Sequence, residues 1–343
     1  MHLKHMNYGH QAKNSSAESL DGVVRPCEDA GIVFSKGQLE VADASMTNGE
    51  DDRGRRAMRE ANSIVSALSL RYPQLRLPIA AGMSGSERYK AAVLRGIIPD
   101  ADPEGFGSAL DSFREVRTAL GTVGVWCLEN RTDFVRVVQA LAYRCEPREI
   151  PKAVGAQYIG GLANWEKIRA HKTRYLAGGG RDWGQEFRRF TADKANYTDS
   201  LILLSSGFYS DIPPEALSMS AEEWKSRSMT VRGYHELTHF LYRRAYPGDV
   251  DVIRDEVLAD CMGLMAAFGH YSPALAERFL GIRASELLPE ARLRHYVPAD
   301  ALAEGIRRAR FWINTFAALL ADLSGQWKFF DCPCNESRLS VYI

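Results

Sequence analysis

The sequence has no excess charge of either sign. Its 43 lysines and arginines equal its 43 aspartates and glutamates, so the formal net charge is zero. Proteins that coat nucleic acid or anionic membranes need a basic excess. We therefore expect neither a nucleic acid nor a membrane among the partners of this chain.

Long apolar runs are missing as well. No stretch reaches the roughly 18 consecutive apolar residues of a transmembrane helix, and the first residues, Met1 to Asn7, lack the apolar core of a signal peptide. The six cysteines are scattered along 343 residues, a length that can build a core without disulfides. These features predict a cytoplasmic protein.

Several familiar catalytic and binding signatures are also lacking. The sequence contains no Gly-x-Ser-x-Gly elbow of a serine hydrolase. Gly178 to Gly180 are not followed by the Lys-Ser/Thr of a phosphate-binding loop. Cys332 and Cys334 form a lone Cys-x-Cys without the second pair that a structural zinc site needs, so we expect an inert tail there.

The periodicity of the chain predicts an α+β, helix-rich fold in four parts. Residues 1–52 are expected to be a flexible or loosely packed extension, 53–148 a mainly helical region, 149–330 a catalytic region and 331–343 a tail. Helices are predicted over 57–72, 84–95, 102–121, 130–141, 220–245, 251–268 and 299–323, with a further helix that begins at Ser272-Pro273. Strands are predicted over 123–128, 156–159 and 201–206.

The strongest chemical signal is the run His235-Glu236-Leu237-Thr238-His239. Residues four apart lie on one face of a helix, so both imidazoles can bind one cation. Glu236, beside the first histidine, can then reach a metal-bound water. The spacing predicts the metal site of a zinc hydrolase.

A second pair of residues follows on the next predicted helix. Glu256 and Asp260 are again four apart, and a Pro-Gly turn between the two helices allows them to pack side by side. The alternative for this acidic stretch is a solvated helix face with Arg254.

The two motifs together resemble the gluzincins, the thermolysin-like zinc metallopeptidases, over His235 to Asp260. The resemblance implies a zincin-like catalytic domain with a small sheet beside its active-site helix and its glutamate helix. It implies His235, His239 and Glu256 as ligands of one zinc ion per chain, and Asp260 as the residue that orients His235. Glu236 would be the general base that activates water for attack on an amide carbonyl. The same ligand set can also hold iron(II) or manganese.

Two further roles remain open at this stage. The oxyanion formed in the reaction needs a donor, and the candidates are His270, Tyr271, His295 and Tyr296, of which we favour His295 with Tyr296 in a loop before Pro298. The strand over 201–206 is either an edge strand that pairs with extended substrate, as in zincins, or a buried core strand.

The function predicted from these residues is a zinc-dependent metallohydrolase, in the first place a peptidase. The alternative is a zinc enzyme that acts on a small molecule by amide hydrolysis, lyase or dehydration chemistry, because site and substrate are separable. The substrate is thus a peptide or a small molecule, and the sequence leaves the oligomeric state open. His171, among Lys167, Arg169, Lys172 and Arg174, is expected on a solvated helix face, with anion binding as the alternative.

Overall fold

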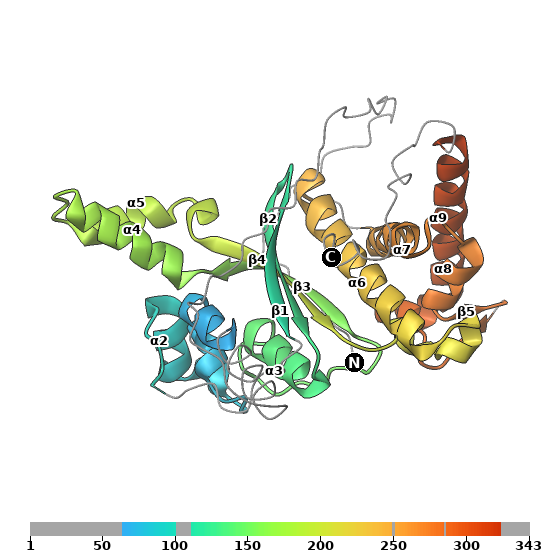
Figure 1. The fold of residues 1–343 in the computed structure, drawn as a ribbon, viewed down its shortest axis with the longest axis horizontal. Helices are drawn as coiled ribbons and strands as arrows, with labels where there is room; N and C mark the ends of the chain where they lie inside the picture. Colours follow the sequence, from blue (N-terminus) through green and yellow to red (C-terminus); the bar gives the residue numbers. More distant parts are fainter. Residues whose placement is uncertain (1–63, 101–110, 249–250, 285, 324–343) are drawn as a thin grey trace, which may run out of the picture.

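A four-stranded mixed sheet lies at the centre of the molecule. The computed structural model describes residues 64–100, 111–248, 251–284 and 286–323. Helices α2 and α3 lie on one side of the sheet and α6 to α9 on the other, while α4 and α5 form a hairpin that projects from the body (Figure 1). The protein is therefore α+β and helix-rich, as predicted.

The described elements have the following bounds. The strands of the sheet are β1 (Ser112–Thr118), β2 (Gly121–Leu128), β3 (Ala156–Ala163) and β4 (Thr198–Ser205), and a small hairpin joins β5 (Ile282–Arg283) to β6 (Glu286–Leu287). A first helix covers residues 64–71. The other helices are α2 (Glu87–Arg95), α3 (Arg131–Leu141), α4 (Trp165–Ala177), α5 (Trp183–Thr191), α6 (Ala221–Ala245), α7 (Val252–Phe268), α8 (Pro273–Phe279) and α9 (Leu302–Leu323).

Strand β4 lies inside the sheet, whose order is β1-β2-β4-β3. It pairs in parallel with β2 and antiparallel with β3, and Leu201 to Leu204 are fully buried. A continuous apolar run of this kind is typical of a strand covered on both faces. The prediction that 201–206 is an edge strand for substrate is therefore wrong, and the core alternative is confirmed. Within the described residues the edge on this side is β3.

The helix predicted over 102–121 is wrong where the structure describes it. Ser112–Thr118 form strand β1, which pairs along its whole length with β2, and 101–110 lie outside the described residues. Phe113 and Val116 have a helical spacing, but tertiary pairing overrides a local preference of this size. The turn between them is Ala119-Leu120, and Gly121 directly after it has a φ of 120°, which glycine adopts readily.

The helices that carry the chemical motifs begin and end close to the predicted residues. Ser220 caps α6 by accepting a hydrogen bond from the backbone N–H of Glu223, and Asp251 caps α7 in the same way at Arg254. Asn130 caps α3 as expected. The predicted helix over 84–95 begins later, at Glu87, because Ser86 rather than Ser84 is its cap.

The sheet takes two strands from each side of the boundary expected near residue 148. One apolar core packs α2, α3 and the helix over 64–71 against the sheet, and a second joins α6, α7, α8 and α9. A third, smaller cluster places Phe240 of α6 against Val125, Ile202 and Leu204 of the sheet. Of the two helices of the candidate site, α6 is thus anchored directly on the sheet, and α7 packs against α6.

Two expectations concern cysteines and membranes. Cys127, Cys145 and Cys261 are free thiols, while Cys332 and Cys334 lie outside the described residues, as do the predicted extension 1–52 and tail 331–343. In the part of the chain that the structure describes, every helix is too short or too polar to cross a bilayer.

Candidate metal centre

Helices α6 and α7 approach each other closely where they carry the two motifs. A Cβ atom on Gly263 would lie 2.8 Å from the backbone oxygen of Val231, a separation that real side chains do not adopt. The absence of a side chain at Gly263 therefore lets the backbones come together. This approach brings the histidines of α6 to the carboxylates of α7.

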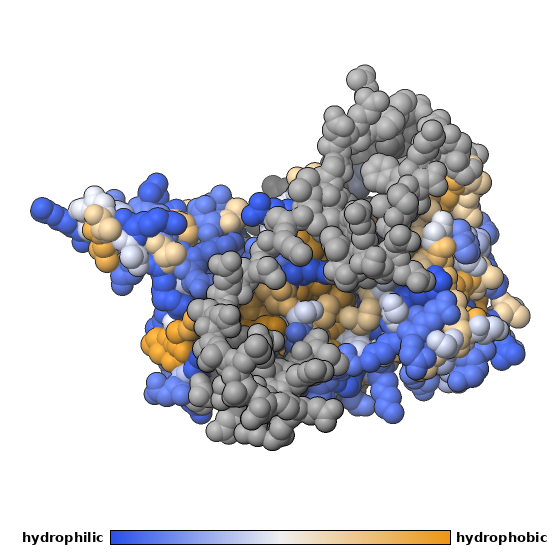
Figure 2. Space-filling view, in the orientation of Figure 1, coloured by the Kyte–Doolittle hydropathy of each residue, from blue (hydrophilic) through white to orange (hydrophobic). Residues whose placement is uncertain are grey.

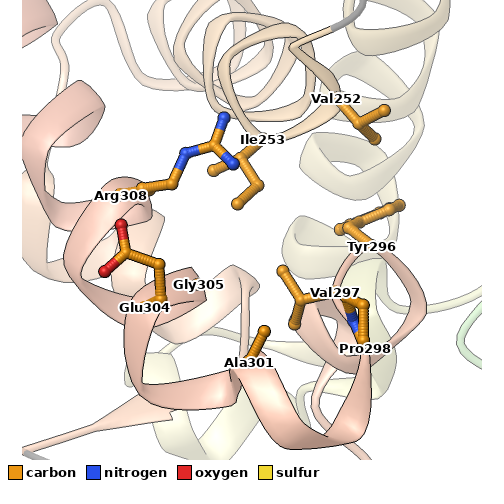
Figure 3. Close-up of a pocket in the computed structure, with 9 residues that line it drawn as sticks. All are labelled: Val252, Ile253, Tyr296, Val297, Pro298, Ala301, Glu304, Gly305 and Arg308. Atoms are coloured by element: carbon orange, nitrogen blue, oxygen red, sulfur yellow. The ribbon is translucent and has the colours of Figure 1, made fainter.

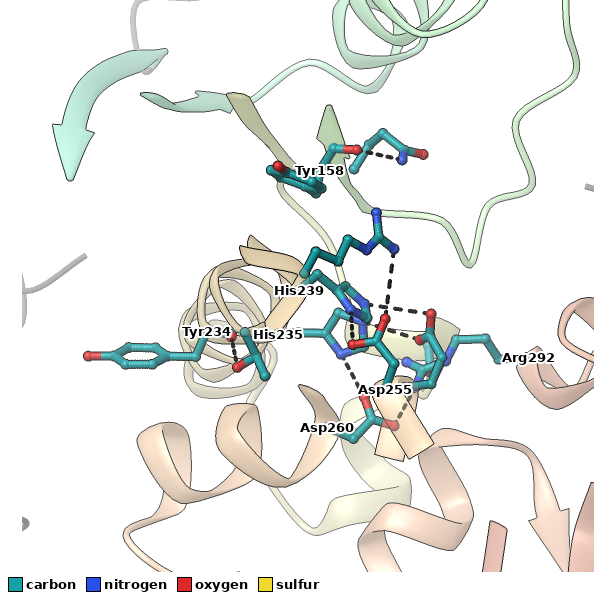
Figure 4. Close-up of polar contacts among 12 residues, drawn as sticks. Tyr158, Tyr234, His235, His239, Asp255, Asp260 and Arg292 are labelled. Carbon is teal, nitrogen blue, oxygen red and sulfur yellow. Dashed lines mark hydrogen bonds and ion pairs between the residues drawn. The ribbon is translucent and has the colours of Figure 1, made fainter. Parts of the chain in front are cut away.

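The structure brings His235, His239 and Glu256 together in a buried cluster. Nε2 of His235 lies 3.0 Å from Nε2 of His239. The Glu256 carboxylate lies 3.4 Å from the first of these nitrogens and 3.6 Å from the second. One ligand atom from each residue falls within 4.8 Å of the others. Figure 4 shows the two imidazoles turned toward the carboxylates of α7.

The outer nitrogen of each imidazole is held by an aspartate. Nδ1 of His235 lies 2.9 Å from Oδ1 of Asp260, and Nδ1 of His239 lies 2.9 Å from Oδ1 of Asp255. A carboxylate accepts hydrogen bonds, so each Nδ1 carries a proton, and in the neutral ring each Nε2 presents a lone pair. This arrangement fixes the tautomer in which both Nε2 atoms can bind a metal ion.

Asp260 is the centre of a larger buried network. The Tyr209 hydroxyl donates to its Oδ1 at 2.6 Å and lies 3.0 Å from Nδ1 of His235. Arg292 forms an ion pair with the other oxygen of Asp260 and donates to the Tyr209 hydroxyl at 2.6 Å. Both oxygens of this fully buried carboxylate are thereby satisfied, and His235 is held in place.

The electrostatics of the cluster favour a positive charge between the two helices. Burial alone would lower the pKa of His235, but Asp260 and Glu256 more than offset it and raise the pKa to about 10. Burial would raise the pKa of Glu256, yet His239 and His235 lower it below its ordinary value. Burial would likewise raise the pKa of Asp260, but Arg292, His235 and Tyr209 together lower it below its ordinary value.

The donor set fits a divalent cation. Oε2 of Glu256 is buried and lacks a hydrogen-bond partner within the described residues, and an unsatisfied buried oxygen is costly. Two facing imidazole lone pairs repel each other unless a proton or a metal ion lies between them. Two neutral imidazoles with one carboxylate form the ligand set of catalytic zinc sites, which keep a fourth position open.

The cluster opens onto a large groove. Glu236, His235, His239 and Glu256 all line this groove, whose volume is about 1810 Å³. Its opposite wall includes strand β3 (Ala156–Ala163), the edge of the sheet within the described residues, and the preceding Gly155. Figure 2 shows apolar side chains at the surface of a hollow near the middle of the molecule.

The four residues considered as hydrogen-bond donors to the oxyanion divide into two pairs. His295, which is exposed at the end of the 3₁₀ helix Arg292–His295, and Tyr296 line the groove, whereas His270 and Tyr271 do not. Burial and the nearby Glu256 raise the pKa of Tyr296 well above its ordinary value. Tyr296 also lines a smaller pocket of about 200 Å³ between the start of α7 and α9 (Figure 3).

Three residues of the candidate centre had no role assigned from the sequence, although Tyr209 was expected near the cleft if the strand over 201–206 paired with substrate. Asp255 was taken only as part of an acidic face, although it directly precedes Glu256 and could have been suspected as a partner of His239. Tyr209 and Arg292 reach Asp260 from 51 and 32 residues away. No local pattern signals contacts at that separation.

His171, on the basic face of α4, makes structural contacts, whereas Lys172 and Arg174 on that helix are exposed. His171 on α4 lies 2.6 Å from Oε1 of Glu186 on α5 and stacks on Phe190 with ring centroids 4.0 Å apart. Arg189 completes this group by donating to Glu186. These contacts hold the projecting hairpin together.

Comparison with known proteins places the chain in a family without assigning an activity. No curated protein and no solved structure matches it significantly. A family of unknown function matches residues 47–323, which include both helices of the candidate metal centre and all four strands of the sheet. The chain therefore belongs to the family of unknown function DUF7005.

Proposed function

We propose that the chain is a zinc-dependent hydrolase of gluzincin type, with a zincin-like catalytic region, that cleaves amide bonds in peptides. The observation that carries the proposal is the convergence of two imidazole Nε2 atoms and the Glu256 carboxylate, with each Nδ1 held by its own aspartate. A structural cluster of histidines would not need both tautomers fixed in this way.

His235, His239 and Glu256 hold the ion, one zinc per chain. When bound, a zinc ion polarises the substrate carbonyl and makes water acidic enough to attack near neutral pH. Asp260 and Asp255 keep the imidazoles aligned. Arg292 and Tyr209 keep Asp260 in place from outside the cluster.

Glu236 is the general base. It lies beside His235 at the wall of the groove and is 8% exposed. Its carboxylate takes a proton from the attacking water and returns it to the leaving amine nitrogen as the C–N bond breaks. Tyr296 and His295, which line the same groove, supply hydrogen bonds to the oxyanion that forms on the carbonyl carbon.

The shape of the groove supports a peptide as substrate. Pockets for small ligands usually measure about 300–1000 Å³, and this groove is larger. Strand β3 has one side paired with β4 and, within the described residues, its other side open. An extended chain can add to such an edge through backbone hydrogen bonds. The alternative substrate, a small molecule, would leave most of the groove without a role.

The test combines metal analysis with a cleavage assay. We expect purified protein to contain about one zinc per chain, measured by plasma mass spectrometry. Incubation with a diverse peptide library should yield products that mass spectrometry identifies by cleavage site. A folded protein that binds no divalent metal would refute the hydrolase. A metal-loaded protein that cleaves nothing in the library would point to the small-molecule alternative.

A further inference from the structure

We infer that Arg243 binds an anionic side chain of the substrate next to the reaction centre, so that the groove selects acidic peptides. This inference rests on the proposed function for the nature of the substrate. It assigns a specificity-determining role to a residue that belongs to neither motif.

Arg243 stands between the metal centre and the edge strand. It follows His239 by four residues on α6, so the two side chains lie on one face of the helix. Its guanidinium carbon lies 5.5 Å from the centre of the Tyr158 ring on β3. Its Nη2 lies 3.8 Å from Oδ2 of Asp255. Arg243 thus spans the space through which a chain paired with β3 would pass.

These contacts orient the guanidinium of Arg243 but leave it able to bind a further group. The distance of 3.8 Å to Asp255 exceeds the 2.7–3.2 Å or so of an N–H···O hydrogen bond, and Asp255 already accepts from His239 through its other oxygen. The side chain is 44% exposed. Stacking against an aromatic ring leaves the planar N–H donors of arginine open to a carboxylate, which they can bind in a bidentate manner.

The charges along the groove point to the same substrate. Its carboxylates within the described residues belong to α6 or to the first turns of α7 and its cap: Glu236, Asp251, Asp255 and Glu256. Beyond β3 the charged groups of the wall are Lys90, Arg144, Arg148 and Lys194. Arg144 and Arg148 rest over the rings of Tyr89 and Tyr143.

This distribution matters because an extended chain alternates its side chains between two sides. A peptide paired with β3 would direct one set toward α6 and the other toward the cations beyond the strand. Acidic side chains are favoured by Arg243 on the first side and by Arg144 and Arg148 on the second. Basic side chains would meet like charge at Arg243 on the first side and at Arg144 and Arg148 on the second.

The experiment measures binding without turnover. The full-length protein with Glu236→Gln is loaded with zinc and titrated with three fluorescent ten-residue peptides that differ only in two central residues, Glu, Gln or Lys. Fluorescence anisotropy should show the Glu peptide binding about tenfold or more tightly than the Gln peptide, as expected for a charge-assisted contact. The Lys peptide should bind most weakly.

Substitutions of Arg243 then test the assignment. Arg243→Gln should remove most of the preference for Glu over Gln, and Arg243→Lys should retain a reduced preference. Arg243→Glu should shift the preference toward the Lys peptide, a gain that simple loss of structure cannot produce. Arg244→Gln is the matched control. Arg244 is the next residue, but it donates to the backbone of Leu120 and does not line the groove, so its removal should leave the preference unchanged.

The outcomes separate this inference from the proposed function. Cleavage of library peptides without a charge preference would leave the hydrolase standing and overturn the role of Arg243. Selective binding of acidic peptides that depends on Arg243, without cleavage by the unsubstituted protein, would support the inference and refute the hydrolysis. Equal binding of the three peptides, or no binding, would overturn the inference. Circular dichroism checks that each variant is folded.

Discussion

Asp255, the residue before Glu256 in α7, holds its Oδ1 2.9 Å from Nδ1 of His239. A single turn of this helix therefore supplies both a candidate ligand and the group that orients another ligand. One turn later in α7, Asp260 orients His235 through its Nδ1 atom in the same way. The two helices are coupled through the imidazoles as well as through their apolar faces.

We expect Asp255→Ala to weaken zinc binding by about 10- to 100-fold, because the outer hydrogen bond to a metal-binding histidine fixes its ring and tautomer. Competition with a chromogenic chelator measures the affinity. Glu222→Ala, an exposed carboxylate on α6, is the control and should change little. Unaltered affinity in the Asp255 variant would show that His239 is not a ligand.

Glu236→Gln should separate metal binding from catalysis. The amide keeps the size of the side chain but cannot take a proton, so turnover should fall by about 100-fold or more. Zinc content should remain near one per chain, because Glu236 is not among the converging ligand atoms. Glu222→Gln is again the control. Retained activity with full metal content would exclude Glu236 as the base.

Two glycines on the paired helices should respond in opposite directions to alanine. Gly263→Ala puts a Cβ 2.8 Å from the Val231 carbonyl, and we expect it to reduce the free energy of unfolding by about 1–3 kcal/mol and to weaken zinc binding as the helices separate. Gly233→Ala places its Cβ 3.8 Å from Leu204 and should stabilise α6 by about 0.5–1 kcal/mol. Urea unfolding measures both, and a tolerated Gly263→Ala would contradict the close approach.

The α4–α5 hairpin should weaken in acid. Hydrogen bonds from Arg189 and His171 lower the pKa of Glu186 from 4.5 to about 2. A carboxyl whose pKa is depressed by folding contributes stability above its unfolded pKa and loses that contribution as the pH falls toward the folded value. The stability difference between the protein and Glu186→Gln should therefore shrink between about pH 4.5 and pH 2. A difference that does not vary with pH in urea titrations would contradict this ion pair.

The local signals of the sequence were sufficient for the helices that carry the motifs. Ser220 and Asp251 mark the starts of α6 and α7, because a capping side chain acts within its own turn. The i, i+4 spacing of the histidines then requires their side chains to share a face. The convergence of His235, His239 and Glu256 on one point matches the arrangement expected from those spacings.

Contacts between segments far apart in the sequence could not be predicted from such local signals. The strand β1 was taken for a helix because Phe113 and Val116 have a helical spacing, and only the pairing with β2 decides its conformation. The substrate-facing edge was sought in 201–206, whereas β3 flanks that strand and forms the edge in the described residues. The wall of the groove depends on this strand order, which no local pattern encodes.

The parallel pairing of β2 with β4 has a practical consequence for dissecting the protein. A fragment that began at residue 149 would carry both candidate metal-binding motifs but would lack β1 and β2. Its strand β4 would have a bare edge, and the apolar residues Leu201 and Leu203 would lose their cover from α3 and Trp126. Such exposed strands drive aggregation. The amino-terminal helices and strands are therefore part of the scaffold of the candidate metal centre, and the motif-bearing half is not expected to fold as a separate module.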